Sequence, residues 1–176
     1  MYYECLKAPD SLAYNIPAML VFDMSTSSDM LAKAITSVVA AHPTLSARFV
    51  QEGEDVTLVS SDAPVKIERV SCSEEELAAY RDSFVRPFDL ATGPLARFAV
   101  ATTPERTCLL ADFHHLAFDG ASMDNFLGEL TEALDGAEGA FESYTFADHA
   151  KDEQTYAASN EFEETRAYIA SLFEEF

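Results

Sequence analysis

The chain has 176 residues, of which 48% are apolar and spread evenly along its length, so it is a folded globular unit and not a disordered chain. Lys and Arg number 11 against 31 Asp and Glu, which gives a formal charge of −20. A surface that acidic repels phosphate backbones and anionic lipid headgroups, so we expect no nucleic acid and no membrane partner.

The cysteines and the N-terminus indicate a compartment. Cys5, Cys72 and Cys108 lie far apart and outside any CxxC pair, which is typical of free thiols in a reducing environment. The first residues, MYYECLKAPDSLAYNIP, lack the features of a signal peptide, and no apolar run reaches the roughly eighteen residues of a membrane span. We therefore expect a cytoplasmic protein, and the lack of repeats or linkers predicts a single unit.

The first half of the chain predicts a strand, a helix and three further strands. Residues 13–23 suit a buried strand, and apolar residues at helical spacing from Leu31 to Val39 predict a helix of about fourteen residues. Ser27 or Ser28 supplies its N-cap, and His42-Pro43 ends it. Residues 45–51, 56–60 and 65–70 then look like short strands.

The second half predicts two helices around a strand pair. Ser73 and Glu76 form a capping box that starts a helix over residues 73–85. An irregular segment, RPFDLATGPL, leads to strands over 96–103 and 107–115. We expect Ser122 to cap the next helix, with Asp124 in its first turn, and residues from 146 onward are acidic and helical in pattern, with an apolar face in the last segment that includes Phe176. Strands alternating with helices predict an α/β two-layer sandwich, a mixed sheet with helices packed on it.

The stretch FHHLAFDG, residues 113–120, is the strongest candidate for chemistry. Successive side chains of a strand point to opposite faces, so His114 and His115 cannot serve one cleft equally. Histidine titrates near working pH and suits a general base, while Gly120 tolerates a positive φ or the close approach of a substrate. Two histidines that merely satisfy hydrogen bonds at a strand end fit the pattern as well. A metal site lacks further ligands, and a serine hydrolase lacks its GxSxG elbow.

FHHLAFDGAS resembles the HHxxxDG signature of the condensation domains of nonribosomal peptide synthetases, within the chloramphenicol acetyltransferase-like superfamily. Three more stretches resemble segments of that family in the same order: YNIP at 14–17, HPTLSARF at 42–49 and PFDLATGPLARF at 87–98. The resemblance spans most of the chain. It implies two similar lobes around a channel, with residues 1–176 as the N-terminal lobe alone, since the family's SxAQxR-like opening motif and C-terminal lobe are missing.

The resemblance also implies a reaction. The amine of an acceptor aminoacyl thioester attacks the thioester of an upstream donor, and both substrates are carried on the phosphopantetheine of partner carrier domains, so no cofactor binds this chain directly. The implied partners are the C-terminal lobe, upstream and downstream peptidyl carrier domains, and an adenylation domain.

The same resemblance assigns roles to the motif residues. His115 would face the channel as a base or as a group that positions the amine, and His114 would support it from the opposite face. Asp119 would pair with an arginine to hold the loop, and Gly120 would keep the channel open. The family's arginine is replaced by Ser46 in HPTLSARF, so we expect Arg48 to pair with Asp119 instead.

Other functions remain as alternatives. Epimerization domains carry Ser-Trp after the motif, whereas this chain has Ser122-Met123, and cyclization domains replace the histidines by aspartates. A freestanding acyltransferase that uses a soluble thioester would share the motif. A noncatalytic binding module is the third alternative, because half of a channel neither excludes water nor holds the second substrate. We therefore expect the isolated 176-residue chain to be inactive.

Overall fold

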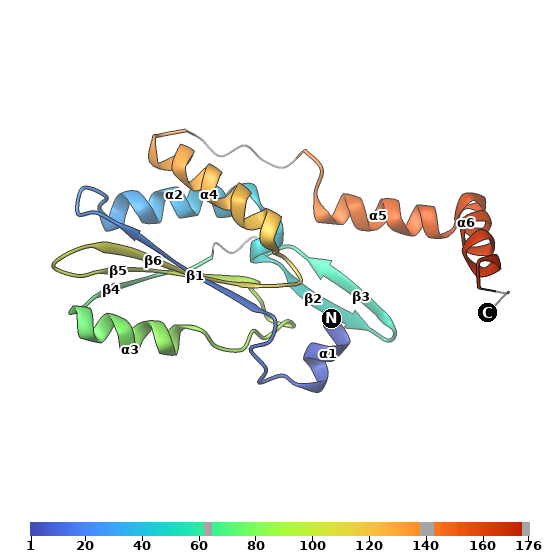
Figure 1. Cartoon of the computed structure of the whole chain (residues 1–176), viewed down its shortest axis with the longest axis horizontal. Helices are drawn as coiled ribbons and strands as arrows, with labels where there is room; N and C mark the ends of the chain where they lie inside the picture. The colour runs from blue at the N-terminus through green and yellow to red at the C-terminus, as the bar shows by residue number, and fades with distance from the viewer. Residues whose placement is uncertain (62–64, 138–142, 174–176) are drawn as a thin grey trace. The chain divides into compact units, whose positions relative to one another are not determined.

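A computed structural model describes residues 1–61, 65–137 and 143–173 of the chain (Figure 1). The chain divides into two compact units, Met1–Phe141 and Glu142–Phe176, and each is described by itself. The first unit contains α1 (Tyr2–Lys7), β1 (Asn15–Phe22), α2 (Ser28–Ala41), the 3₁₀ helix η1 (Pro43–Ser46), β2 (Arg48–Glu52), β3 (Asp55–Val59), β4 (Ile67–Ser71), α3 (Glu74–Phe84), β5 (Ala96–Thr102), β6 (Thr107–His114) and α4 (Gly120–Leu134).

A four-stranded sheet in the order β1-β6-β5-β4 forms the centre of this unit. β6 runs antiparallel to both of its neighbours, and β4 runs parallel to β5, so the prediction of a mixed sheet is confirmed. β2 and β3 form a separate antiparallel pair. β1 was expected to be buried, but it is an edge strand of the sheet, and Val21 on it is 55% exposed.

Helices pack on the sheet, as predicted, but they cover both of its faces, so this unit has three layers where two were predicted (Figure 1). α2 and α4 pack on one face around a core whose largest members include Leu31, Ile35, Phe98 and Phe113. α3 packs on the other face through Leu77 and Phe84, against the opposite side chains of β5 and β6. β6 is buried along its whole length because it lies between two strands and two helical layers.

The predicted helix starts follow local capping chemistry. Ser27 caps α2 by accepting the Met30 N–H at 3.2 Å, and Ser73 and Glu76 complete the expected capping box of α3. His42 ends α2, as predicted, and Pro43 opens η1. The helix α1 was not expected, because its six residues are too few to show a helical period.

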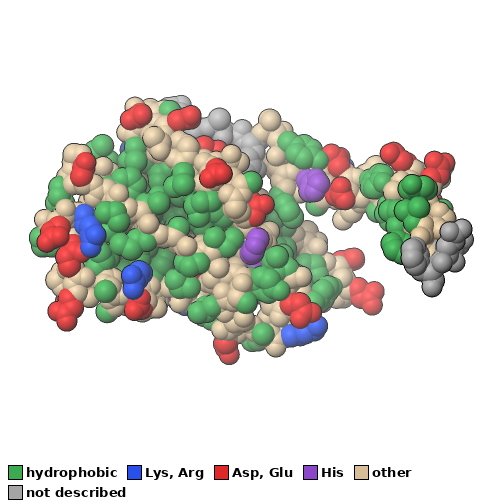
Figure 2. All heavy atoms as spheres, viewed as in Figure 1, with side chains coloured by type: hydrophobic (Ala, Val, Ile, Leu, Met, Phe, Trp, Pro, Cys, Tyr) green, Lys and Arg blue, Asp and Glu red, His purple; other side chains and the backbone are tan. Residues whose placement is uncertain are grey.

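The second unit contains α5 (Phe146–Ala157) and α6 (Asn160–Ser171), which confirms the helical pattern expected there. Thr145 and Asp148 form a capping box at the start of α5. Neither helix buries a residue, and Tyr168, Ile169 and Leu172 are exposed, whereas Phe176 lies outside the described residues. Acidic side chains are spread over the face seen in Figure 2 and basic ones are few, as the charge of −20 requires.

Candidate active site

The motif lies where β6 ends and α4 begins. β6 stops at His114, the N–H of His115 donates to the carbonyl of Tyr14 at 2.9 Å, and the N–H of Ala117 donates to the His114 carbonyl at 2.9 Å. Phe118 stacks flat on Phe113 with 3.8 Å between ring centroids, which holds the loop against the core. The backbone around both histidines is therefore held by the residue that precedes β1, by a tight turn and by an aromatic contact.

His114 is buried and fully engaged. Its Nδ1 accepts the N–H of Leu116 at 3.1 Å, its Nε2 lies 3.6 Å from the Cys5 sulfur, and its ring meets Phe88 edge to face with centroids 5.6 Å apart. Burial lowers the pKa of His114 to about 4, with the nearby His115 and Arg97 as smaller causes. At neutral pH the ring is therefore uncharged, and because Nδ1 accepts a hydrogen bond, its proton is on Nε2.

His115 differs from its neighbour in every one of these respects. Its side chain is exposed, and its ring makes no hydrogen bond or ion pair within the described residues. The expectation that the two histidines have unlike surroundings is met, since one is packed inside and the other faces open space. Of the two, His115 is the one whose side chain is exposed at the surface.

A cavity of about 510 Å³ lies on the His114 side of the motif. It is bounded by α1, by the loop after it and by residues 87–91, and Cys5, Tyr14 and His114 are among its lining residues. His115 does not line it. Burial raises the pKa of the Cys5 thiol, so that group stays protonated and is a weak nucleophile at neutral pH. The cavity therefore does not serve the exposed histidine.

Asp119 caps α4 and does not pair with Arg48. Its Oδ1 accepts the Ser122 N–H at 2.9 Å and the Ser122 hydroxyl at 2.7 Å, and both bonds lower its pKa. The sequence predicted Ser122 as the N-cap of this helix. In the structure the N-cap is Asp119 and Ser122 is a helical residue that donates to it, so Asp124 lies beyond the first turn. Arg48 forms no ion pair with Asp119 in the described chain, because it starts β2, outside the main sheet, with its side chain in solvent.

These contacts predict that two alanine variants differ in how much stability they lose. We expect Arg48→Ala to change the free energy of unfolding by less than about 0.5 kcal/mol, since the side chain is exposed. Asp119→Ala should cost about 1 kcal/mol through loss of the α4 cap. Urea unfolding of both variants measures the difference, and an equal loss in the two would restore the pair that the sequence suggested.

Gly120 is the first residue of α4, and its φ is not positive, so the conformational reason considered for it is wrong. A Cβ added at this position would meet nothing within 4 Å. The chain's own packing therefore does not require a glycine here, and the space beside the residue is open.

Sequence reasoning missed one buried residue near the motif. Asp112 lies two positions before His114 on the same face of β6 and is fully buried. Its carboxylate accepts the side-chain amide of Asn15 at 2.8 Å and lies 3.7 Å from the Arg97 guanidinium. The signal was present in TCLLADFHH, where a single carboxylate interrupts an apolar strand. Among the described residues, no group of His, Cys, Asp and Glu is placed to hold a metal ion.

The fold and the motif define a class of protein. A mixed sheet covered by helices, with two histidines where a strand ends, fits the chloramphenicol acetyltransferase-like fold. The chain matches the Condensation domain family over residues 1–176 and belongs to that family. No helix in the described part of the chain is long and apolar enough to cross a membrane.

Similar proteins agree with this assignment. Tyrocidine synthase 3 and tyrocidine synthase 2 of Brevibacillus parabrevis are 30% and 31% identical to the chain over 164 residues. These alignments cover 92% of this chain but only 2% and 5% of the two synthases. The solved structure that describes condensation domain-mediated chain release from the enacyloxin polyketide synthase has a TM-score of 0.78 and 26% identity, covering 94% of this chain and 35% of that one. The resemblance inferred from the motifs is confirmed, and the chain spans a small part of these relatives.

Proposed function

We propose that this chain is the N-terminal lobe of a condensation domain in a nonribosomal peptide synthetase, and that the domain joins two aminoacyl groups carried as thioesters. Family membership and the small share of each relative that the chain covers support this proposal. The observation that carries it is the contrast at the motif, where His115 is exposed on a held backbone and His114 is buried and neutral.

The proposed reaction needs one group that can receive or hold an amine. The amine nitrogen of the acceptor forms a C–N bond with the donor carbonyl carbon, the C–S bond breaks, and the amine proton ends on the released thiol. His115 is the group that we assign to this amine, either as a base or as a hydrogen-bond partner that aligns it. His114 cannot compete for the proton, because its pKa is about 4 and its Nδ1 already accepts a hydrogen bond.

Asp119 and Gly120 have supporting roles in this proposal. By capping α4, Asp119 fixes where the loop that carries His115 ends. The open space at Gly120 suits a substrate arm that passes close to the helix start, since any side chain there would narrow it.

The partners follow from the reaction. We propose that the C-terminal lobe of the same domain supplies the other wall of the channel, and that an adenylation domain and peptidyl carrier domains on both sides supply the substrates on phosphopantetheine. The chain's three cysteines are free thiols, which suits a protein of the reducing cytoplasm.

A reconstitution with loaded carrier domains tests the proposal. The chain joined to the remainder of the domain should transfer the donor group to the acceptor carrier, seen as a mass gain of that carrier in intact-protein mass spectrometry. The 176-residue chain alone should give no product above the uncatalysed rate, because half of a channel neither excludes water nor aligns both substrates.

Three results would contradict the proposal in different ways. Turnover by the 176-residue chain alone would refute its assignment as one lobe. Transfer from a free acyl-CoA thioester in preference to the loaded carrier would favour a freestanding acyltransferase. Tight binding of loaded carriers by the joined domain with no transfer would favour a binding module.

A further inference from the structure

A polar cluster around the buried Asp112 lies directly behind the motif. We call it the Asn15 cluster and define it as the side chains of Asn15, Asp112 and Arg97 with the backbone carbonyls of Arg86 and Pro87. The Asn15 side-chain amide donates to the Asp112 carboxylate at 2.8 Å and to the Arg86 carbonyl at 2.9 Å. The Arg97 guanidinium donates to the carbonyls of Arg86 and Pro87 at 2.6 and 3.0 Å. It lies 3.7 Å from Asp112 Oδ2, which neutralises part of the buried charge.

The cluster joins stretches that lie far apart in the sequence. Asn15 belongs to YNIP, Arg97 to GPLARF, Arg86 and Pro87 lead into FDL, and Asp112 precedes the two histidines. Asn15 and Asp112 are 97 positions apart. None of these residues bonds to the ring of His115, so the proposed chemistry gives them no role so far.

Burying these groups is costly for the fold. Asp112 is fully buried, burial raises its pKa, and its Oδ1 has no hydrogen-bond partner within the described residues. Burial likewise lowers the pKa of Arg97. Apolar residues of the same size would generally serve stability as well or better. What a buried polar network adds is a defined geometry, because its hydrogen bonds are made in only one arrangement.

The geometry that it defines is that of the motif backbone. Asn15 pairs with His114 in the β1–β6 register, and the carbonyl of the preceding residue, Tyr14, accepts the N–H of His115. This backbone connection is one route from the cluster to the motif, and a second route runs through side chains. The Arg97 guanidinium lies 3.7 Å from the centre of the Phe88 ring, and the rings of Phe88 and His114 meet edge to face. His114 in turn accepts the N–H of Leu116. The backbone route therefore ends on the N–H of His115 itself, and the side-chain route ends on its two neighbours, His114 and Leu116.

We propose that Asn15, Asp112 and Arg97 are positioning residues for His115, and that Arg97 controls both routes. It binds the Arg86 carbonyl, which Asn15 also binds, and the Pro87 carbonyl, and it supports the Phe88 ring against His114. The role given to His115 itself rests on the proposed function, whereas its placement by the Asn15 cluster is a structural property of this chain.

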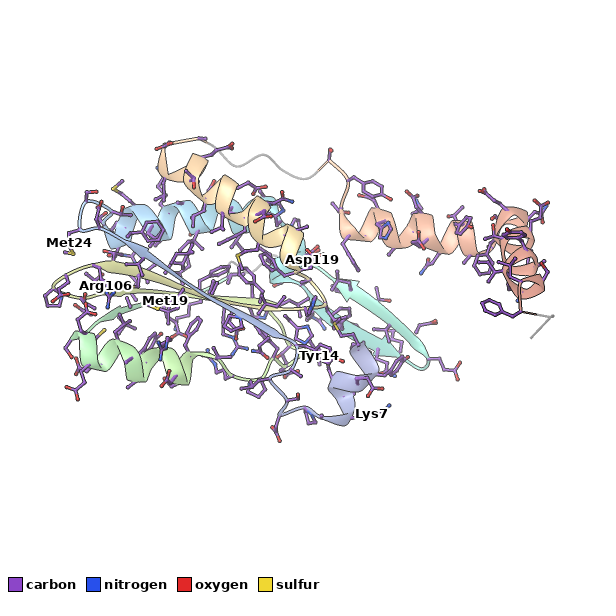
Figure 3. The ribbon with its side chains drawn as sticks, viewed as in Figure 1. Lys7, Tyr14, Met19, Met24, Arg106 and Asp119 are labelled. Atoms are coloured by element: carbon purple, nitrogen blue, oxygen red, sulfur yellow. The ribbon has the colours of Figure 1, made fainter. Side chains whose placement is uncertain are left out.

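Two variants of Arg97 and one control test the placement in the 176-residue chain. Arg97→Met removes the guanidinium, and Arg97→Lys keeps the charge but loses the fork that binds two carbonyls. The control is Arg106→Met, which breaks a half-buried ion pair with Glu74. Arg106 lies at the far end of the sheet from Tyr14 and Asp119, as Figure 3 shows.

The readouts are hydrogen exchange of the His115 and Leu116 amides and the NMR signals of the His115 ring. We expect Arg97→Met to lower the protection of both amides at least about tenfold and to shift the ring signals, because local opening replaces the held turn. Arg97→Lys should give an intermediate loss. Arg106→Met should leave both readouts unchanged even where it costs similar global stability.

An activity measurement in the joined domain separates positioning from simple loss of folding. Arg97→Lys should lower kcat about 10- to 100-fold while KM stays within about twofold, since a misplaced group mainly affects the reacting geometry. Arg106→Met should keep kcat.

Equal amide protection in Arg97→Met and Arg106→Met would overturn the inference. If Arg97→Met does not fold, Arg97→Lys decides the question by the same comparison, and Phe88→Leu tests the side-chain route alone through the ring signals of His115. The exchange and NMR results do not depend on any substrate. They would stand if the joined domain proved inactive, which would count only against the proposed function.

Discussion

Replacing His115 by alanine is expected to lower the rate of condensation by the joined domain about 10²- to 10⁴-fold, the usual contribution of a positioned acid or base. The same change should alter the free energy of unfolding by less than about 0.5 kcal/mol, because the side chain is exposed and its ring bonds to nothing in the described chain. The rate is measured with loaded carrier domains and the stability by urea unfolding.

His115→Gln distinguishes the two roles considered for this residue. Glutamine can accept or donate a hydrogen bond to the amine but cannot take its proton at neutral pH. A variant as slow as His115→Ala indicates a base, whereas a rate within about tenfold of the unaltered domain indicates alignment. His149→Ala, at an exposed position on α5, is the matched control and should keep the full rate. Full activity of His115→Ala would remove His115 from the mechanism.

The parts of the fold that the sequence predicted correctly depend on residues that are close together in the chain. The Ser27 cap, the Ser73–Glu76 capping box and the apolar spacing of α2 each involve residues within one or two helical turns, and the structure has them in place. The strand pair β5–β6 was equally accessible, since four residues separate two apolar runs. The unlike surroundings of His114 and His115 agree with the prediction, but their cause differs from strand alternation, because β6 is buried on both faces and ends at His114, and the exposed His115 lies in the turn after it.

The parts that were missed depend on long-range register. Nothing local in YNIP indicates that Asn15 lies opposite His114 or that its side chain reaches Asp112, because β1 and β6 are distant in sequence. The edge position of β1 is also a property of strand order, which apolar content does not encode.

Two predictions around Asp119 were wrong: that Ser122 caps α4 and that Arg48 pairs with Asp119. Asp119 and Ser122 are both good N-cap residues, and only the backbone shows that the aspartate accepts the serine N–H. Once its oxygen is used in this way, Asp119 needs no arginine. The pairing expected with Arg48 is absent among the described residues although β2 packs beside the motif, where Phe49 belongs to the cluster that contacts Leu116 and Ala117, because the Arg48 side chain points into solvent.

Acid should destabilise this chain through His114, and the size of the effect is predictable. The pKa of His114 is about 4 in the folded chain, against about 6.5 for an unfolded histidine. Between these values the unfolded state binds more protons than the folded state, so the free energy of unfolding is highest above pH 6.5 and falls as the pH drops toward 4. Between pH 8 and pH 5 this linkage amounts to about 2 kcal/mol.

His114→Asn isolates that contribution. The asparagine oxygen can still accept the Leu116 N–H, as His114 Nδ1 does, but the residue no longer titrates. Asp112 shifts stability in the opposite direction, since burial raises its pKa and its proton favours the folded state, but it is present in both chains and cancels in the difference. We would monitor urea unfolding through the amide signals of β6. Between pH 8 and pH 5, the free energy of unfolding should fall by about 2 kcal/mol more in the unaltered chain than in His114→Asn.

His149→Asn makes the same substitution at an exposed histidine and should retain the full pH dependence. If the unaltered chain and His114→Asn lose stability in parallel between pH 8 and pH 5, then His114 protonates without cost in the folded state. That result would contradict the assignment of a buried, neutral His114, and with it the reason for giving the amine to His115 alone.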